Sequence, residues 1–267
     1  MASVKEMDTY AKLWMKEAGS KLRASFETKL NIEIKTNPND LVTNMDKAIE
    51  TFFCDKITET FPEHRIFGEE GMGNEIKDLK GTVWILDPID GTLNFIHQQR
   101  NFAISLGIYE DGIGKIGMVY DVVNDELYHV IKGEGAFMND QRLSPLKEVS
   151  VSKAILSMNA SWVTENRRID PSLLAPLVRD ARGTRSYGSA ALELAYVAAG
   201  RLDAYITMRL MPWDFAGGVL LVEEVGGEVS NITDKKLDFL EGDSLFVSKP
   251  GMHKEVFEKY LTGNTSL

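Results

Sequence analysis

Residues 83–94 read Val83-Trp84-Ile85-Leu86-Asp87-Pro88-Ile89-Asp90-Gly91-Thr92-Leu93-Asn94, a hydrophobic run that leads into two aspartates. The first four residues are apolar and partly β-branched, which predicts a short strand covered on both faces. Pro88 cannot donate a hydrogen bond to a sheet and Gly91 relaxes the backbone, so we expect the strand to end at Asp87 and the chain to turn there. Asp87 and Asp90 would then project together from the edge of a sheet.

Two carboxylates held close together repel each other unless a proton or a cation lies between them. Mg²⁺ suits such a turn, because it takes oxygen ligands and is usually bound by one or two carboxylates together with a substrate phosphate. The carbonyl of Ile89, between the two aspartates, is a further candidate ligand. Gly91 and Thr92 open a segment that we expect to be helical, and the free N–H groups at a helix start can bind phosphate. The sequence therefore predicts that a metal ion and a phosphate group meet at this turn.

The same residues have two other interpretations. Asp-Pro-x-Asp-Gly-Thr is good turn chemistry, so the stretch taken alone is equally consistent with a plain loop between a strand and a helix. It also partly matches Asp-x-Asp-Gly-Thr, a phosphotransferase signature in which the first aspartate is a nucleophile. Asp87 and Asp90 are three residues apart, so that match fails. Acidic residues elsewhere in the chain must decide between the loop and the metal site.

Composition and charge limit the class of protein. The chain has 267 residues, of which 43% are hydrophobic and 26% charged, as in ordinary globular proteins. No apolar run approaches the roughly 20 residues that span a bilayer, and the N-terminus lacks the features of a secretory signal. Cys54 is the only cysteine, which excludes an internal disulfide and fits a reducing cytoplasm. The net charge of -10 argues against a nucleic-acid surface. We expect a cytoplasmic protein with no membrane or nucleic-acid partner.

Hydrophobic spacing predicts the order of the elements. In the N-terminal half we expect helices over 3–26 and 46–61, a strand over 31–35 that a break at 36–39 follows, and an antiparallel meander of strands over 102–109, 115–123 and 126–131. In the C-terminal half strands over 155–158, 203–208, 228–232 and 245–248 alternate with helices over 171–182, 188–199, 213–225 and 252–261. This alternation predicts an α/β layer. A soft boundary near 144–152 separates an N-terminal region, residues 1–147, from a C-terminal region, residues 148–267.

Three further acidic residues lie at the ends of predicted elements. Asp46 and Asp214 each fall in the first turn of a helix, where the helix dipole alone accounts for a carboxylate. Glu69 lies in a glycine-flanked loop 18 residues before Asp87, and a hairpin-like return to the strand at Val83 would bring it to the same edge. A solvated loop is the alternative for Glu69. Together, the three acidic positions favour one shared site.

Three blocks of residues resemble the signature blocks of the inositol monophosphatase family, which are Mg²⁺-dependent, lithium-sensitive phosphomonoesterases. The blocks are Gly68-Glu69-Glu70, Trp84 to Phe95, and Trp213-Asp214-Phe215-Ala216-Gly217-Gly218. Their order and spacing span nearly the whole chain, including residues 35–46 and the turn at 135–137. The resemblance implies an α/β (α+β) fold, a layered α-β-α-β-α sandwich of the sugar-phosphatase type. It also implies a homodimer with the metal ions between the two sheets.

The resemblance also implies a role for each site residue. Two or three Mg²⁺ ions would be held by Glu69, Asp87, the Ile89 carbonyl, Asp90 and Asp214. Thr92, oriented by Asp46, would help to activate a water molecule, with Glu69 as the other partner of that water. The small phosphorylated substrate would contact the amides of Gly91 and Thr92, and further Ala190, Thr207, Arg209 and Asp214. The N-terminal region would thus carry most of the metal ligands, and the C-terminal region would contribute Asp214 and substrate contacts.

The chain departs from the family at one substrate position. Animal members have a glutamate that contacts inositol hydroxyls where this chain has Thr207, and Arg209 nearby is available either for a second anionic group or for solvent. We therefore expect hydrolysis of inositol 1-phosphate and of other small phosphate monoesters. The alternatives are an NADP(H) 2'-phosphatase, a fructose-1,6-bisphosphatase or a 3'-phosphoadenosine 5'-phosphate phosphatase. A non-enzymatic alternative is a regulatory protein-binding member of the family.

Overall fold

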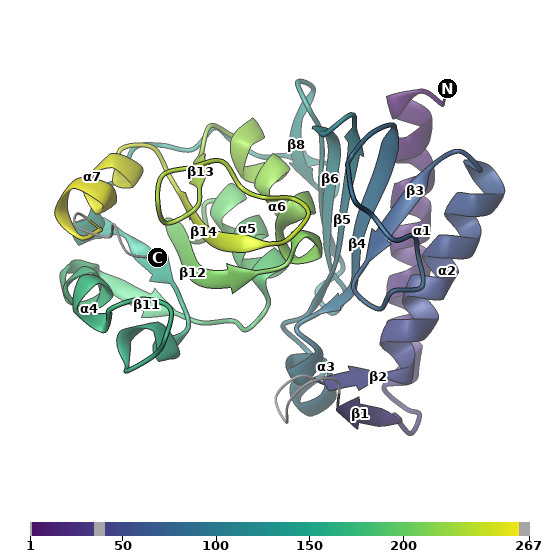
Figure 1. Cartoon of the computed structure of the whole chain (residues 1–267), viewed down its shortest axis with the longest axis horizontal. Coiled ribbons are helices and arrows are strands. Elements are labelled where there is room, and N and C mark those ends of the chain that lie inside the picture. Colours follow the sequence, from purple (N-terminus) through teal and green to yellow (C-terminus); the bar gives the residue numbers. More distant parts are fainter. Residues whose placement is uncertain (1, 35–40, 262–267) are drawn as a thin grey trace.

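The computed structural model describes residues 2–34 and 41–261 and shows five layers (Figure 1). Helices α1 (Val4–Ser25) and α2 (Asn44–Thr60) cover the outer face of a seven-stranded sheet. Helices α5 (Ala190–Ala198) and α6 (Pro212–Glu224) lie between this sheet and a five-stranded sheet, whose other face packs on α4 (Pro171–Asp180) and α7 (Met252–Lys259). The α-β-α-β-α sandwich is confirmed. No helix within the described ranges is long and apolar enough to cross a membrane.

The seven-stranded sheet follows the order of the chain. Its strands are β3 (Arg65–Gly68), β4 (Thr82–Asp90), β5 (Ala103–Glu110), β6 (Ile113–Asp121), β7 (Glu126–Ile131), β8 (Gly135–Met138) and β9 (Gln141–Arg142). The pairings from β4 to β9 are all antiparallel, which confirms the predicted meander. The short strands β8 and β9 were not predicted. Strands β1 (Ile32–Ile34) and β2 (Leu41–Thr43) form a separate antiparallel pair. The predicted break at 36–39 lies outside the described residues.

The five-stranded sheet mixes both pairing directions. Its order is β11 (Gly183–Arg185), β10 (Ile155–Ser157), β12 (Ala204–Leu210), β14 (Asp243–Ser248) and β13 (Glu228–Ser230). Strand β10 runs parallel to β11 and β12, and β14 is antiparallel to β12 and β13. Two 3₁₀ turns, η1 (Val151–Lys153) and η2 (Ala160–Val163), complete this half. We propose the boundary at 147/148 as a division along the sequence only, because α5 and α6 pack against the first sheet as well as the second.

The predicted end of the central strand was wrong, and its correction explains the site. Strand β4 continues through Pro88 to Asp90. From Asp87 to Asp90 it takes three steps while its partner β5 takes two, from Ser105 to Ala103, so the pairing contains a bulge. Proline is tolerated there because a bulge leaves a residue out of the hydrogen-bond ladder. In a regular strand, residues three apart point to opposite faces; the extra residue brings Asp87 and Asp90 to the same face.

The approach of the chain to this strand also differs from the prediction. Strand β3 pairs with β4 in parallel, from Arg65 opposite Val83 to Gly68 opposite Leu86. A parallel neighbour cannot be reached through a tight hairpin, so residues 69–81 return along the outer edge of β3, where the N–H of Asn74 donates to the Ile66 carbonyl at 2.7 Å, before β4 begins. The hairpin-like return was therefore wrong. Glu69 nevertheless leaves β3 beside β4, where its N–H donates to the carbonyl of Leu86 at 3.3 Å.

Helix α6 lies against the seven-stranded sheet at glycine contacts. A Cβ atom added at Gly217 would lie 2.5 Å from the carbonyl oxygen of Leu106 and 2.7 Å from that of Met118. A Cβ atom added at Gly117 on β6 would collide with the backbone carbonyl of Gly217. All three obstacles are backbone carbonyls, so these two positions require glycine if the helix is to keep its distance from the sheet. This contact therefore sets the distance between the first turn of α6 and strand β4.

We expect Gly217→Ala to destabilise the fold, because the methyl group must push α6 away from two backbone carbonyls. Overpacking of this kind costs about 1–3 kcal/mol, or roughly 2–12 °C of melting temperature for a chain of this size. The measurement is thermal unfolding followed by circular dichroism. Gly183→Ala on β11 is the matched control, since its Cβ would meet nothing closer than 3.7 Å. Equal melting temperatures for the two variants would contradict the proposed contact.

Candidate active site

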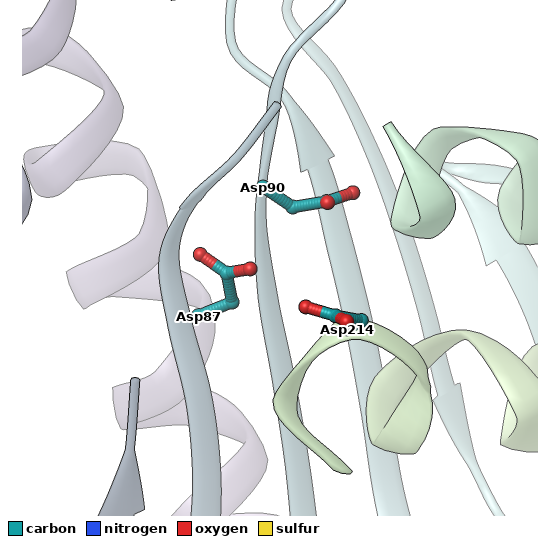
Figure 2. A group of neighbouring side chains, drawn as sticks. All are labelled: Asp87, Asp90 and Asp214. Carbon is teal, nitrogen blue, oxygen red and sulfur yellow. The ribbon is translucent and has the colours of Figure 1, made fainter. Parts of the chain in front are cut away.

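Three aspartates from two separate elements converge above the β4 bulge. Asp87 and Asp90 come from β4, and Asp214 comes from the first turn of α6 (Figure 2). Each offers a carboxylate oxygen, and these oxygens all lie within 4.8 Å of one another. Asp87 and Asp90 are buried and Asp214 is partly exposed. The structure thus brings positions 87, 90 and 214 together, as the sequence predicted.

The start of α6 is held so that Asp214 faces β4. Pro212 occupies the first turn, where its missing N–H costs nothing. The N–H of Met211 donates to Asp214 Oδ2 at 2.8 Å, so one oxygen of the carboxylate caps its own helix. The hydroxyl of Ser105 on β5 donates to the Trp213 carbonyl at 2.9 Å and ties this turn to the sheet. Asp214 therefore lies in the first turn of a helix, as predicted, and belongs to the cluster as well.

Asp90 is tied to the other half of the chain. The hydroxyl of Ser189 and the N–H of Ala191, at the start of α5, both donate to Asp90 Oδ2 at 2.6 Å. Because both donors use Oδ2, Oδ1 is the oxygen that can serve a cation. Sequence reasoning missed Ser189 and Ala191. A serine before an alanine-rich helix signals an N-cap, but no local pattern indicates a partner 99 residues away.

Hydrogen bonds to Asn94 and Glu193 hold the loop that carries Ser189. The side-chain amide of Asn94 donates to the carbonyls of Tyr187 and Asn101, each at 2.7 Å. On the opposite side, Glu193 Oε1 accepts from the N–H of Tyr187 at 2.7 Å. Burial raises the pKa of Glu193 to about 7, although its hydrogen bonds oppose this shift. Asn94 and Glu193 were also absent from the predicted site, and their hydrogen bonds hold the loop that carries Ser189.

Asp46 and Thr92 are joined as the sequence suggested. Asp46 Oδ2 accepts from the N–H of Thr43 at 2.7 Å and from its hydroxyl at 2.5 Å, which completes a capping box at the start of α2. Its other oxygen lies 3.2 Å from the hydroxyl of Thr92, which is also 3.1 Å from the Ile89 carbonyl oxygen. Asp46 is thus both a structural cap and the partner of Thr92. Burial raises the pKa of Asp46, against the lowering effect of its bonds to Thr43.

The carboxylates of the cluster are electrostatically unfavourable to one another. Burial raises the pKa of Asp87 well above its ordinary range, and the charges of Glu69, Asp90 and Asp214 raise it further. Burial also raises the pKa of Asp214, with the charge of Asp90 as the next cause. Burial raises the pKa of Asp90 to about 6, although the bonds from Ser189 and Ala191 oppose this. Buried oxygen donors that repel each other suit a hard divalent cation such as Mg²⁺.

Glu69 acts on the cluster without belonging to its tightest group. Its charge contributes to the raised pKa of Asp46, Asp87, Asp90 and Asp214, which places it within electrostatic reach of all four. The three oxygens within 4.8 Å of one another come from the aspartates alone. Glu69 as a metal ligand therefore stays a prediction.

Gly91 forms the turn between β4 and α3 (Thr92–Gln98). It has a φ of 96°, and an added Cβ would lie 3.2 Å from the carbonyl oxygens of Asn101 and Gly188, so the position favours glycine. No side chain caps the N-terminus of α3. The N–H groups at Gly91 and Thr92 therefore stand at an uncapped helix start next to the acidic cluster, as the sequence predicted.

The predicted substrate contacts lie in the second half of the chain. Ala190 is the first residue of α5 and is buried beside Ser189. Thr207 is buried on β12, opposite Leu245. Arg209 is exposed near the end of the same strand and lines a pocket with Met211. Their contacts with a substrate stay predictions.

Comparisons with known proteins give a consistent result. A model of the inositol monophosphatase family matches residues 3–263. The inositol-1-monophosphatase of Bacillus subtilis (strain 168) is 61% identical over 261 residues, which cover 98% of each chain. SaIMPase-II with bound inositol monophosphate is 44% identical, with a TM-score of 0.86 over 96% of this chain and 93% of that one. The complex of SaIMPase-II with 2'-AMP is 46% identical, with a TM-score of 0.88 over the same shares.

A more distant solved structure is also similar over the full length. An IMPase/NADP phosphatase complexed with NADP and Ca²⁺ is 29% identical, with a TM-score of 0.91 over 100% of this chain and 98% of that one. The resemblance inferred from the three signature blocks is therefore confirmed at the level of the family.

Mg²⁺ should raise the melting temperature of the protein, because a cation bound between the aspartates offsets their repulsion in the folded state only. A ligand at 100 times its dissociation constant adds about 2.7 kcal/mol. Asp87→Asn keeps an oxygen for the Ile89 N–H but removes one charge, so this variant should gain much less from Mg²⁺. In a chelator it should melt no lower than the wild type. Calorimetry with Mg²⁺ and with EDTA measures both effects.

The matched control for this measurement is Glu75→Gln, which removes an exposed carboxylate that pairs with the exposed Lys77. It should respond to Mg²⁺ as the wild type does. If Asp87→Asn gains as much from Mg²⁺ as the control, the cluster is not the cation site.

Proposed function

The chain belongs to the inositol monophosphatase family, and we propose that it hydrolyses inositol 1-phosphate and other small phosphate monoesters with Mg²⁺ as cofactor. The observation that carries this proposal is the convergence of Asp87, Asp90 and Asp214 within 4.8 Å. The 61% identity to an inositol-1-monophosphatase supports the substrate class. The shorter, uncharged Thr207 in place of a glutamate supports acceptance of substrates other than inositol phosphates.

We assign the cofactor to Asp87, the Ile89 carbonyl, Asp90, Asp214 and Glu69, which together could hold two or three ions. Mg²⁺ when bound supplies Lewis acidity, since it neutralises phosphate charge and lowers the pKa of water. The chain's own donors would position the substrate: the N–H groups of Gly91 and Thr92 would bind the phosphate oxygens. Ala190, Thr207 and Asp214 would face the rest of the substrate.

Thr92 and Glu69 are proposed to prepare the attacking water. The Thr92 hydroxyl can donate its hydrogen to Asp46 Oδ1, 3.2 Å away, which leaves its oxygen as an acceptor for a water O–H. Thr43 fixes Asp46 in this role. Glu69 would take the proton as the water oxygen bonds to phosphorus. The ester P–O bond breaks on the opposite side, and the alcohol leaves with a proton from solvent.

The assembly and location complete the proposal. We propose a homodimer in the cytoplasm with no nucleic-acid or membrane partner. The net charge of -10 and the lone Cys54 support the absence of a polyanion partner and a reducing compartment. Gel filtration with light scattering tests the oligomeric state.

A nucleotide 2'-phosphate is a second candidate substrate. Solved structures similar to this chain hold 2'-AMP in SaIMPase-II and NADP in an IMPase/NADP phosphatase. Arg209 offers this chain a positive charge in a pocket that Met211 also lines. Phosphate release should be profiled with inositol 1-phosphate, fructose 1,6-bisphosphate, NADP and 3'-phosphoadenosine 5'-phosphate. A tenfold or greater preference for inositol 1-phosphate over all others would reject the broad specificity.

The same assay separates the enzyme from a regulatory protein. We expect release of phosphate that depends on Mg²⁺ and is suppressed by Li⁺. A folded protein that releases no phosphate from any of these substrates would favour the regulatory alternative.

Asp90→Asn should lower kcat by roughly 10³-fold or more while the protein stays folded, because it removes charge from the proposed metal site but keeps an oxygen for Ser189 and Ala191. Steady-state kinetics with Mg²⁺ and a melting curve on the same sample provide the measurement. Glu75→Gln is again the control. Wild-type activity in the Asp90→Asn variant would remove the central assignment.

Thr92→Ala should lower kcat by roughly 10²-fold, within the range for loss of a group that orients a reactant or moves a proton. Thr92→Ser keeps the hydroxyl and should restore most of the activity. Kinetics of the two variants at saturating Mg²⁺ provide the test. An alanine variant with the same kcat as the serine variant would show that the hydroxyl plays no part.

A further inference from the structure

A basic pocket opens beside the turn that carries Asp214, and Met211 of that turn is part of its lining. It has a volume of about 630 Å³ and lies between the end of β12, the loop before β14 and the segment before α4. The lining includes three arginines and two carboxylates: Arg167, Arg168, Arg209, Glu241 and Asp243. Three positive charges in one pocket stand out in a chain whose net charge is -10. The residues around the three arginines show what kind of ligand the pocket would take.

The arginines are not used to hold the fold together. All three are exposed, and within residues 2–34 and 41–261 none of their guanidinium groups has an ion-pair partner or a hydrogen-bond acceptor. Asp243, by contrast, is occupied by the fold, because it accepts from the side chain of Asn231 and from the N–H of Ser244. Glu241 is exposed. The arginine charges therefore remain available to a ligand.

The pocket shares a wall with the proposed metal site. Met211 lines the pocket, and its N–H is the group that donates to Asp214 Oδ2 at 2.8 Å. Gly242 packs closely against Met211 in this wall. Its φ is 82°, and an added Cβ would lie 3.2 Å from the Met211 Cα atom. Met211 therefore lies between the pocket and the acidic cluster, which makes the two sites neighbours.

We propose that Arg167, Arg168 and Arg209 form a subsite for a second anionic group of the substrate, a phosphate or diphosphate on the portion released as the alcohol. Guanidinium groups suit this task because their forked N–H donors match phosphate oxygens and stay charged at all working pH values. The buried side chains of Met208 and Ile232 in the wall lower the local polarity, which strengthens such contacts. This inference rests on the proposed hydrolysis of phosphate monoesters.

NADP and 2'-AMP are the matched pair of probes. Both carry an adenosine 2'-phosphate, but only NADP also carries a diphosphate. The measured quantity is the ratio of kcat/KM for NADP to kcat/KM for 2'-AMP. For the variant Arg167→Gln/Arg168→Gln, we expect this ratio to fall at least tenfold, mainly through a higher KM for NADP. Glu241→Gln removes an opposing charge and should raise the ratio.

Arg179→Gln is the control for loss of an arginine outside the pocket, because Arg179 is exposed on α4 and does not line the pocket. It should leave the ratio unchanged. The ratio for the wild type should fall with added salt, as exposed charge contacts are screened. Melting curves of all variants exclude a loss of folding as the cause.

The outcomes separate this inference from the proposed function. Release of phosphate from inositol 1-phosphate by the wild type supports the function independently of the pocket. If the wild type hydrolyses 2'-AMP but not NADP, or neither nucleotide, the subsite is rejected while the function stands. An unchanged ratio in the double arginine variant, or a fall equal to that in Arg179→Gln, also rejects it. Absence of hydrolysis of every phosphate ester rejects the function and the subsite together.

Discussion

The repulsion between Asp87, Asp90 and Asp214 is the constraint around which the rest of the structure is arranged. Their carboxylate oxygens lie within 4.8 Å of one another. This arrangement destabilises the folded state, because burial and like charge both oppose ionisation. They stay together because neither of the elements that carry them can relax. Asp87 and Asp90 are fixed by a bulge inside a sheet of seven strands, and Asp214 by a helix that contacts that sheet through backbone atoms.

In each aspartate of the cluster, one carboxylate oxygen accepts hydrogen bonds from the protein and the other is available to a cation. In Asp87, Asp90 and Asp214 the structure uses one oxygen, which accepts from the N–H of Ile89, from Ser189 and Ala191, and from the N–H of Met211 respectively. The other oxygen can face the shared centre. Uncharged N–H and O–H donors orient each carboxylate without adding a positive side chain. A lysine or arginine in their place would neutralise the charge that a cation needs.

The sequence predicted which residues take part better than how they are brought together. Asp87, Asp90 and Asp214 follow from turn chemistry, helix starts and the family resemblance. The bulge does not, because Pro88 normally ends a strand and only the pairing with β5 shows that β4 continues. The parallel approach of β3 and the bond from Ser189 to Asp90 are likewise long-range facts with no local signature. Local patterns thus specify chemistry, whereas register and packing specify geometry.

The aspartate cluster and the arginine-lined pocket differ in how their residues are held. The cluster is built on elements whose positions are set by sheet pairing and glycine contacts, so it tolerates little variation. Arg167, Arg168 and Arg209 instead project from a loop and the end of a strand into a pocket that carries no structural bonds from their side chains. Such positions can change charge without disturbing the fold. Met211 joins the two regions, because its N–H donates to Asp214 and the same residue lines the pocket. An anionic group bound in the pocket would lie against Met211, so the proposed subsite and the proposed metal site share the residue whose N–H orients Asp214.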